Sequence, residues 1–137
     1  MTTWIKKGLL LSLCMIMTAC VSEMGLREEF DKSMKAYNRM LRWQEYENAG
    51  MLYQERELRD EYMKRVEVIK KRGVTLADFR IITSECLAEK KTGEVIAEFD
   101  YYVLPSNRVK TITYRQQWIY QESEKSWKLK SPLPLFD

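Results

Sequence analysis

The stretch GEVIAEFDYYVLPSNRVKTITYRQQWIYQ, residues 93–121, contains two runs in which apolar and polar side chains alternate. Alternation with a period of two is typical of β-strands that bury one face. The Pro-Ser-Asn sequence at 105–107 separates the two runs and is typical of a turn. The stretch therefore predicts an antiparallel β-hairpin.

One register suits both faces of this hairpin. Folding about Ser106 and Asn107 pairs apolar side chains on the inner face and opposite charges on the outer face. The pairs are Phe99 with Tyr114, Tyr101 with Ile112, Val95 with Trp118 and, outside, Glu98 with Arg115. Because a slip of one residue would turn every side chain over, we expect each residue to keep its face.

Two further strands extend the hairpin into a four-stranded antiparallel meander. We expect strands at 75–88, 93–104, 109–121 and 126–131, with prolines 132 and 134 ending the sheet. A turn at 123–124 gives the pairs Tyr120 with Trp127 and Trp118 with Leu129. In the first strand, Phe79, Ile81 and Leu87 compete with Ile82, Ser84 and Cys86 for the inner face, and a β-bulge would reconcile the two sets.

Before residue 73 the apolar period is that of helices. One stripe consists of Leu26, Phe30, Met34, Tyr37 and Leu41, and a second of Leu58, Tyr62, Val66 and Ile69. We expect a kink or a second helix near Gly50, because glycine lowers helix propensity. Gly73 follows three basic residues and suits the left-handed position that ends many helices.

Helices followed by hairpins predict an α+β domain, with N-terminal helices packed on a curved four-stranded antiparallel meander. This order resembles the cone-shaped nuclear transport factor 2-like (cystatin-like) superfamily. The resemblance covers about residues 26–136 and rests on the element order, the segment Trp43–Ala49 and the strands holding Gln117-Trp118 and Trp127. It implies a sheet wrapped around helices with an open-mouthed cavity, although other arrangements of helices on a meander share this order.

Such a cavity has candidate lining residues in the inner row of the sheet. They are Tyr101, Tyr114, Gln116 and Trp118. Gln116 is strongly polar in an otherwise apolar and aromatic row, so it needs a buried partner or a wet pocket. One interpretation is a pocket for a small apolar ligand or lipid, anchored by one polar group. The other is a packed core with hydrogen-bonded tyrosines and glutamine.

The N-terminal segment has the features of an export signal. Lys6 and Lys7 precede an apolar run at 8–17, which is too short to span a bilayer as a helix. The tetrad Met17-Thr18-Ala19-Cys20 then resembles the lipobox of bacterial lipoproteins. The resemblance implies a signal peptide at 1–19, lipid attached covalently to Cys20, a tether at 20–25 and one domain at 26–137.

The same resemblance implies a location and a partner. Val21 stands where an aspartate commonly retains lipoproteins in the inner membrane, so we expect the outer membrane, with the domain facing the periplasm. In a host with one membrane, the expected place is the outer face of the cell membrane. Membrane lipid is thus the expected partner, through an acyl anchor that at least two chains make stable.

Composition argues against several kinds of chemistry. The chain has no histidine, which removes the commonest general base and the commonest metal ligand, so we expect no metal and no cofactor beyond the lipid. Removal of the leader leaves a formal charge near +1, which argues against nucleic acid as a partner. Cys86 would be the one remaining free thiol, and we interpret it as a small apolar residue.

Three functions compete. We favour a non-catalytic adaptor or structural module that contacts another envelope protein, because the body is small, nearly neutral and aromatic-rich. Exposed aromatic residues among Trp43, Tyr46, Tyr53 and Tyr102 would serve it. The alternative is a periplasmic binder of a small apolar ligand. An enzyme is least favoured, because the strand pattern places Asp100 on the outer face, away from Tyr114. The basic residues at 64–65 and 70–72 are interpreted as a solvated helix face and end.

Overall fold

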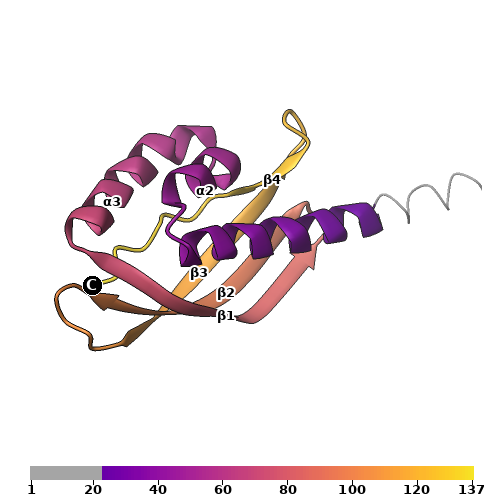
Figure 1. The fold of residues 1–137 in the computed structure, drawn as a ribbon. Helices are drawn as coiled ribbons and strands as arrows, with labels where there is room; N and C mark the ends of the chain where they lie inside the picture. The colour runs from indigo at the N-terminus through magenta and orange to yellow at the C-terminus, as the bar shows by residue number, and fades with distance from the viewer. Residues whose placement is uncertain (1–22) are drawn as a thin grey trace, which may run out of the picture.

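The structure is a computed structural model that describes residues 23–137. Cys20 and the rest of the tetrad at 17–20 lie outside the described residues. Within them, three α-helices precede a four-stranded antiparallel sheet and pack on one of its faces (Figure 1). The predicted α+β class is confirmed.

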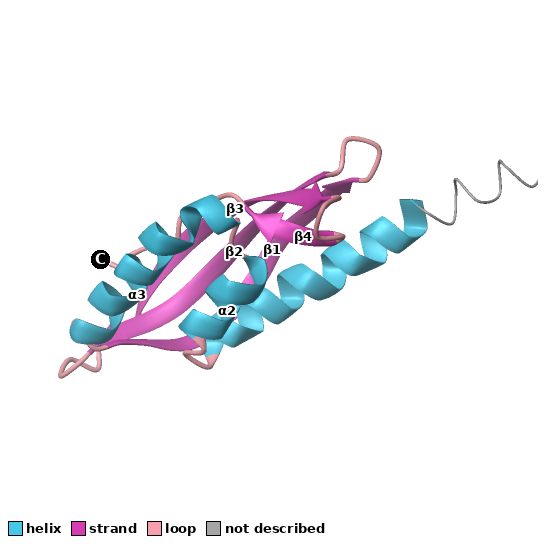
Figure 2. Ribbon diagram, turned by 90° about the horizontal axis from the view of Figure 1, so that it is seen from above, coloured by secondary structure: helices cyan, strands magenta, loops and turns pink. Residues whose placement is uncertain are grey.

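The helical half consists of four elements. A long helix spans residues 23–42, so residues 23–25, assigned above to the tether, are helical. It is followed by α2 (Tyr46–Tyr53), a single 3-10 turn η1 (Arg56–Leu58) and α3 (Arg59–Lys71). Seen from above, the long helix and α3 run side by side over the sheet with α2 between them (Figure 2). None of the described helices combines the length and apolar character needed to cross a bilayer.

The break between the first two helices differs from the prediction. It lies at residues 43–45, where Gln44 has a φ of 56°, whereas Gly50 lies inside α2. A Cβ at Gly50 would stand 2.2 Å from Cε1 of Tyr62. Gly50 is therefore needed for the close approach of α3, and not for a bend. Gly73, with a φ of 71°, takes the predicted left-handed position after α3.

The strands are β1 (Val74–Leu87), β2 (Thr92–Val103), β3 (Lys110–Gln121) and β4 (Ser126–Leu129), hydrogen-bonded in that order. The last hairpin has the predicted register, with Tyr120 opposite Trp127 and Trp118 opposite Leu129. In β1, register shifts occur on either side of Ala77 and Ile82. The second shift confirms the predicted bulge and leaves Ile82 half exposed.

The middle hairpin is paired two residues away from the predicted register. The observed partners are Phe99 with Ile112, Ala97 with Tyr114, Val95 with Gln116 and Gly93 with Trp118, while Arg115 faces Ile96. The reason is the connection, which runs from 104 to 109 and is not a tight turn at 106–107. Because the shift is even, every side chain still keeps its predicted face.

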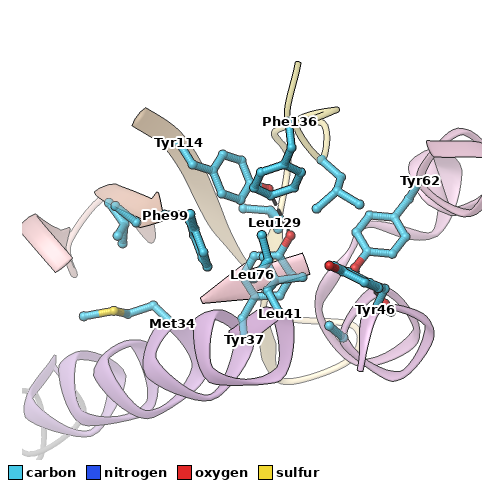
Figure 3. Close-up of a cluster of buried hydrophobic side chains, with 14 of the residues drawn as sticks. Met34, Tyr37, Leu41, Tyr46, Tyr62, Leu76, Phe99, Tyr114, Leu129 and Phe136 are labelled. Carbon is cyan, nitrogen blue, oxygen red and sulfur yellow. Dashed lines mark hydrogen bonds between the residues drawn. The ribbon is translucent and has the colours of Figure 1, made fainter. Parts of the chain in front are cut away.

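The core lies between the helices and the inner face of the sheet (Figure 3). Phe30, Met34, Tyr37 and Leu41 of the long helix are all buried, as the predicted stripe requires. Gly93 allows the long helix to lie close to the sheet, since a Cβ there would stand 2.3 Å from the ring of Phe30.

The segment after β4 closes the core and was not anticipated. Residues 130–137 return along α3, and the side chains of Leu133 and Phe136 are fully buried. Arg65 donates to the carbonyl oxygen of Leu133 at 2.8 Å, and Arg72 to that of Leu135 at 2.7 Å. We call residues 130–137 the C-terminal strap.

Candidate functional site

The four predicted pocket residues all lie on the inner face of the sheet and are buried. Tyr101 comes from β2, and Tyr114, Gln116 and Trp118 come from β3, with exposures of 3% or less. The alternation of β3 brings its three residues into one row facing the long helix. The structure therefore groups these residues as the sequence predicts.

The polar side chains of this row are bonded within the protein. Nε2 of Gln116 donates to Oδ1 of Asn38 at 2.7 Å, and Nδ2 of Asn38 donates back to Oε1 of Gln116 at 3.2 Å. The same Oε1 accepts from Nε1 of Trp118 at 3.3 Å. Asn38 also donates to the carbonyl oxygen of Met34, so both amides are satisfied. Asn38 was not singled out from the sequence. The available signal was its position directly after Tyr37, beside the stripe of the helix that was expected to be buried.

The tyrosines of the site bond in the same way. The hydroxyls of Tyr37 and Tyr114 are 2.9 Å apart, and burial raises the pKa of both well above the ordinary tyrosine value. Figure 3 shows the two rings meeting between the long helix and β3. The hydroxyl of Tyr101 donates to the backbone oxygen of Asp137. These hydroxyls stay protonated at neutral pH and serve as neutral hydrogen-bonding groups.

The C-terminal strap packs against the inner face of the sheet, where the predicted cavity would lie. The ring of Phe136 lies edge-on to Tyr101 and Phe99, with centroids 5.3 Å and 6.1 Å away. Phe30, Tyr37 and Tyr53 pack edge-on against the ring of Trp118. This arrangement favours the packed-core interpretation of the four residues, and their use by a ligand stays a prediction.

We predict that the Asn38–Gln116 pair acts as one unit. Replacing Gln116 with leucine leaves the amide of Asn38 buried without its main partner, which should lower the free energy of unfolding by about 1–3 kcal/mol. Adding Asn38→Leu should restore most of this loss, because both polar groups are then gone. Urea unfolding of the two single variants and the double variant measures the coupling. Additive losses in the double variant would contradict the proposed pairing.

Surface hollows lie at three places among the described residues, and the first of them includes one residue of this row, Trp118. One of about 330 Å³ lies on the sheet face opposite the helices, where Glu85, Glu94, Gln117 and Lys130 are among its lining. A second of about 260 Å³ lies between α3 and the C-terminal strap, with mostly apolar walls that include Tyr62 and Leu133. A third lies at the turn between β3 and β4. Tyr101, Tyr114 and Gln116 line none of the three.

Asp100 lies on the outer face of the sheet, as the alternation predicts. Its partner is Arg80 and not Arg115. The guanidinium of Arg80 donates to Asp100 at 2.8 Å and also to Glu98 at 3.1 Å. The hydrogen bonds from Arg80, and a further one from Thr111, lower the pKa of Asp100 to about 2. The carboxyl is therefore ionised at neutral pH and lies on the opposite side of the sheet from Tyr114.

The remaining candidates have structural contacts. Cys86 is half buried and unpaired among the described residues. Burial raises the pKa of its thiol, so less of the reactive thiolate is present at neutral pH. Lys70 pairs with Glu47, and Arg65 and Arg72 hold the strap. Residues 23–137 contain no cluster of three or more histidine, cysteine or acidic side chains arranged for a metal ion.

Of the four aromatic residues considered for an interface, only Trp43 is largely exposed. Its exposed fraction is 63%, and the guanidinium of Arg42 lies 4.6 Å from its ring centroid. Tyr46 is buried, while Tyr53 and Tyr102 are half buried. Two buried polar groups, the hydroxyl of Tyr46 and Oε1 of Gln54, have no hydrogen-bond partner among the described residues.

Comparison with known proteins adds little to this geometry. The sequence matches no protein-family model and no curated protein. Among solved structures, it is similar to the intermembrane space region of the chloroplast protein ARC6, with 16% identity and a TM-score of 0.48. The alignment covers 72% of this chain and 92% of that one. A likeness at this level carries no conclusion about function.

Proposed function

We propose that this chain is an envelope lipoprotein, anchored by lipid on Cys20, whose folded domain is a non-catalytic interaction module. The proposal of an anchor rests on the tetrad at 17–20 and the basic and apolar leader before it. The expected location is the outer membrane with the domain in the periplasm, or the outer face of the cell membrane in a host with one membrane.

The start of the domain supports a short tether. The carbonyl oxygen of Leu26 accepts from Nε1 of Trp127 at 3.0 Å, and Arg27 donates to the carbonyl oxygen of Cys86 at 2.7 Å. The long helix is thus held by β4 and β1 from its first described turns. Three residues from Cys20 to Glu23 reach at most about 10 Å. An anchor at Cys20 would therefore hold the domain next to the bilayer.

One contrast between the two faces of the sheet carries the proposal of an interaction module. On the inner face, the polar groups that a ligand would use are already bonded to protein groups. None of the helices among residues 23–137 covers the outer face (Figure 1), which contains the hollow of about 330 Å³ beside Glu94 and Gln117. A protein partner that covers this face would use a surface that the fold itself leaves uncovered.

Site-specific photo-crosslinking in intact cells tests this proposal. A photoreactive side chain at Thr113 or Gln117, both exposed on the outer face, should give one discrete adduct with a protein partner. The matched controls are Lys32 and Lys64, which are exposed on the helices. The same pattern of adducts from all four positions, or none from the outer face, would contradict the assignment of this face.

The ligand-binding alternative has one observation in its favour. The hollow of about 260 Å³ between α3 and the C-terminal strap has mostly apolar walls. Gln54 contributes to them, and its Oε1 has no hydrogen-bond partner within residues 23–137. A small apolar molecule with one hydrogen-bond donor suits such a site. Native mass spectrometry of the purified protein would show a stoichiometric bound molecule if this function holds.

A further inference from the structure

The two ends of β1 mark the two ends of the molecule. At one end, the backbone carbonyl oxygen of Cys86 accepts a hydrogen bond from Arg27, near the start of the long helix. At the other end, Gly73 precedes β1, and its carbonyl oxygen accepts from the backbone N–H of Leu104 at 3.1 Å. A 14-residue strand is about 45 Å long, so the connection after β2 lies far from the start of the described chain (Figure 1).

We call this far end the distal tip and define it as Lys71, Gly73 and the loop 104–110. Two of its side chains are apolar and exposed, namely Leu104 at 58% and Val109 at 57%. Three are basic and exposed, namely Lys71, Arg108 and Lys110. From residue 101 to residue 121 the sequence contains no aspartate or glutamate.

The folded domain does not use these charges. Lys70 and Arg72, beside the tip, are engaged by Glu47, the C-terminal strap and Asp137. In contrast, the side chains of Lys71, Arg108 and Lys110 form no ion pair with any of residues 23–137. The tip therefore presents free positive charge around two uncovered apolar side chains.

We propose that the distal tip docks on an anionic lipid bilayer surface. The inference rests on the proposed lipid anchor, because the anchor places the domain beside a membrane. Basic side chains at a bilayer surface are attracted to lipid phosphates, while adjacent apolar side chains enter the interface between headgroups and acyl chains. A soluble anionic polymer would satisfy the basic residues and leave Leu104 and Val109 in water. Both halves of the tip match a lipid surface.

Vesicle capture by the full lipidated protein tests the proposal. The protein is incorporated into neutral phosphatidylcholine vesicles, and labelled vesicles containing phosphatidylglycerol are then added. We expect the two populations to cosediment, and we expect salt to weaken the capture because surface charges are screened. Labelled vesicles of pure phosphatidylcholine should not be captured. Equal capture of neutral and anionic vesicles would overturn the proposal.

Two variants separate the contributions of the tip. Leu104→Ser with Val109→Ser, and Lys71→Glu with Arg108→Glu and Lys110→Glu, should each lower capture at least tenfold. The matched controls are Ile82→Ser and Lys32→Glu, which change an exposed apolar and an exposed basic residue elsewhere and should leave capture unchanged. All these side chains are exposed, and circular dichroism verifies that each variant is folded.

The two proposals fail in different ways. If the wild-type protein does not enter neutral vesicles, the lipid anchor is wrong. If it enters them but does not capture anionic vesicles, or if the tip variants capture as well as the wild type, the distal tip has no such role.

Discussion

Replacing Trp118 with alanine should lower the free energy of unfolding by about 3–5 kcal/mol. The side chain is 1% exposed, and its ring contacts those of Phe30, Tyr37 and Tyr53. Its indole N–H also donates to Gln116, which ties the aromatic cluster to the buried amide pair. Because small domains have a total stability of about 5–15 kcal/mol, this loss is a large part of the whole. Urea unfolding followed by circular dichroism measures it.

Trp43→Ala is the matched control. Trp43 is mostly exposed, and its one notable contact is the guanidinium of Arg42, so its loss should cost less than about 1 kcal/mol. Similar losses for the two tryptophans would show that Trp118 does not hold the place in the core described above.

Replacing Cys20 with serine should abolish attachment of lipid and block removal of the leader. Under the proposed lipoprotein assignment the acyl groups are attached through the sulfur of Cys20, so a hydroxyl at this position offers no thiol to the modifying enzyme. The variant should carry no label after growth in radioactive palmitate and should accumulate as a precursor longer by residues 1–19. Autoradiography and immunoblotting of the same gel measure both effects.

The matched control for this change is Cys86→Ser. Cys86 lies in the folded domain and is half buried, so its loss should leave palmitate incorporation and processing unchanged. Loss of label in Cys86→Ser with retention of label in Cys20→Ser would place the lipid on Cys86 and refute an anchor at Cys20.

The face of each strand residue was predictable from the sequence, but the pairing of the middle hairpin was not. Alternation assigns Phe99, Tyr114 and Trp118 to the inner face, and an even shift in register does not alter that assignment. Turn length decides the pairing, and the loop 104–109 does not have the form of a two-residue turn. The last hairpin kept its register because its aromatic pair, Tyr120 with Trp127, and its turn agree.

The helix break shows a second limit. Local propensity singled out Gly50, yet the ring of Tyr62 from α3 is the reason for a glycine there. Which side chain approaches a helix depends on tertiary packing, which propensity does not include. The C-terminal strap shows the same limit, since prolines 132 and 134 only indicate that the sheet ends. Its course is set by Arg65 and Arg72 of α3, more than sixty residues earlier in the sequence.

The buried row was predictable as a group, and its partners were not. Gln116 was expected to need a hydrogen-bond partner or a wet pocket, and the structure provides Asn38, 78 residues away. Such a pair joins a helix and a strand whose relative placement follows from the whole core. The same reasoning explains why Tyr101 was expected to face an open cavity, although Phe136 of the strap covers it.

The covalent state of Cys20 tests the central claim most directly. Mature protein is extracted from membranes with detergent and digested, and its N-terminal peptide is analysed by mass spectrometry. We predict a peptide that begins at Cys20 and carries a diacylglyceryl group on sulfur together with an N-linked acyl chain. A peptide that begins elsewhere, or one that begins at Cys20 with an unmodified thiol, would contradict the proposal that this domain is held at a membrane by lipid.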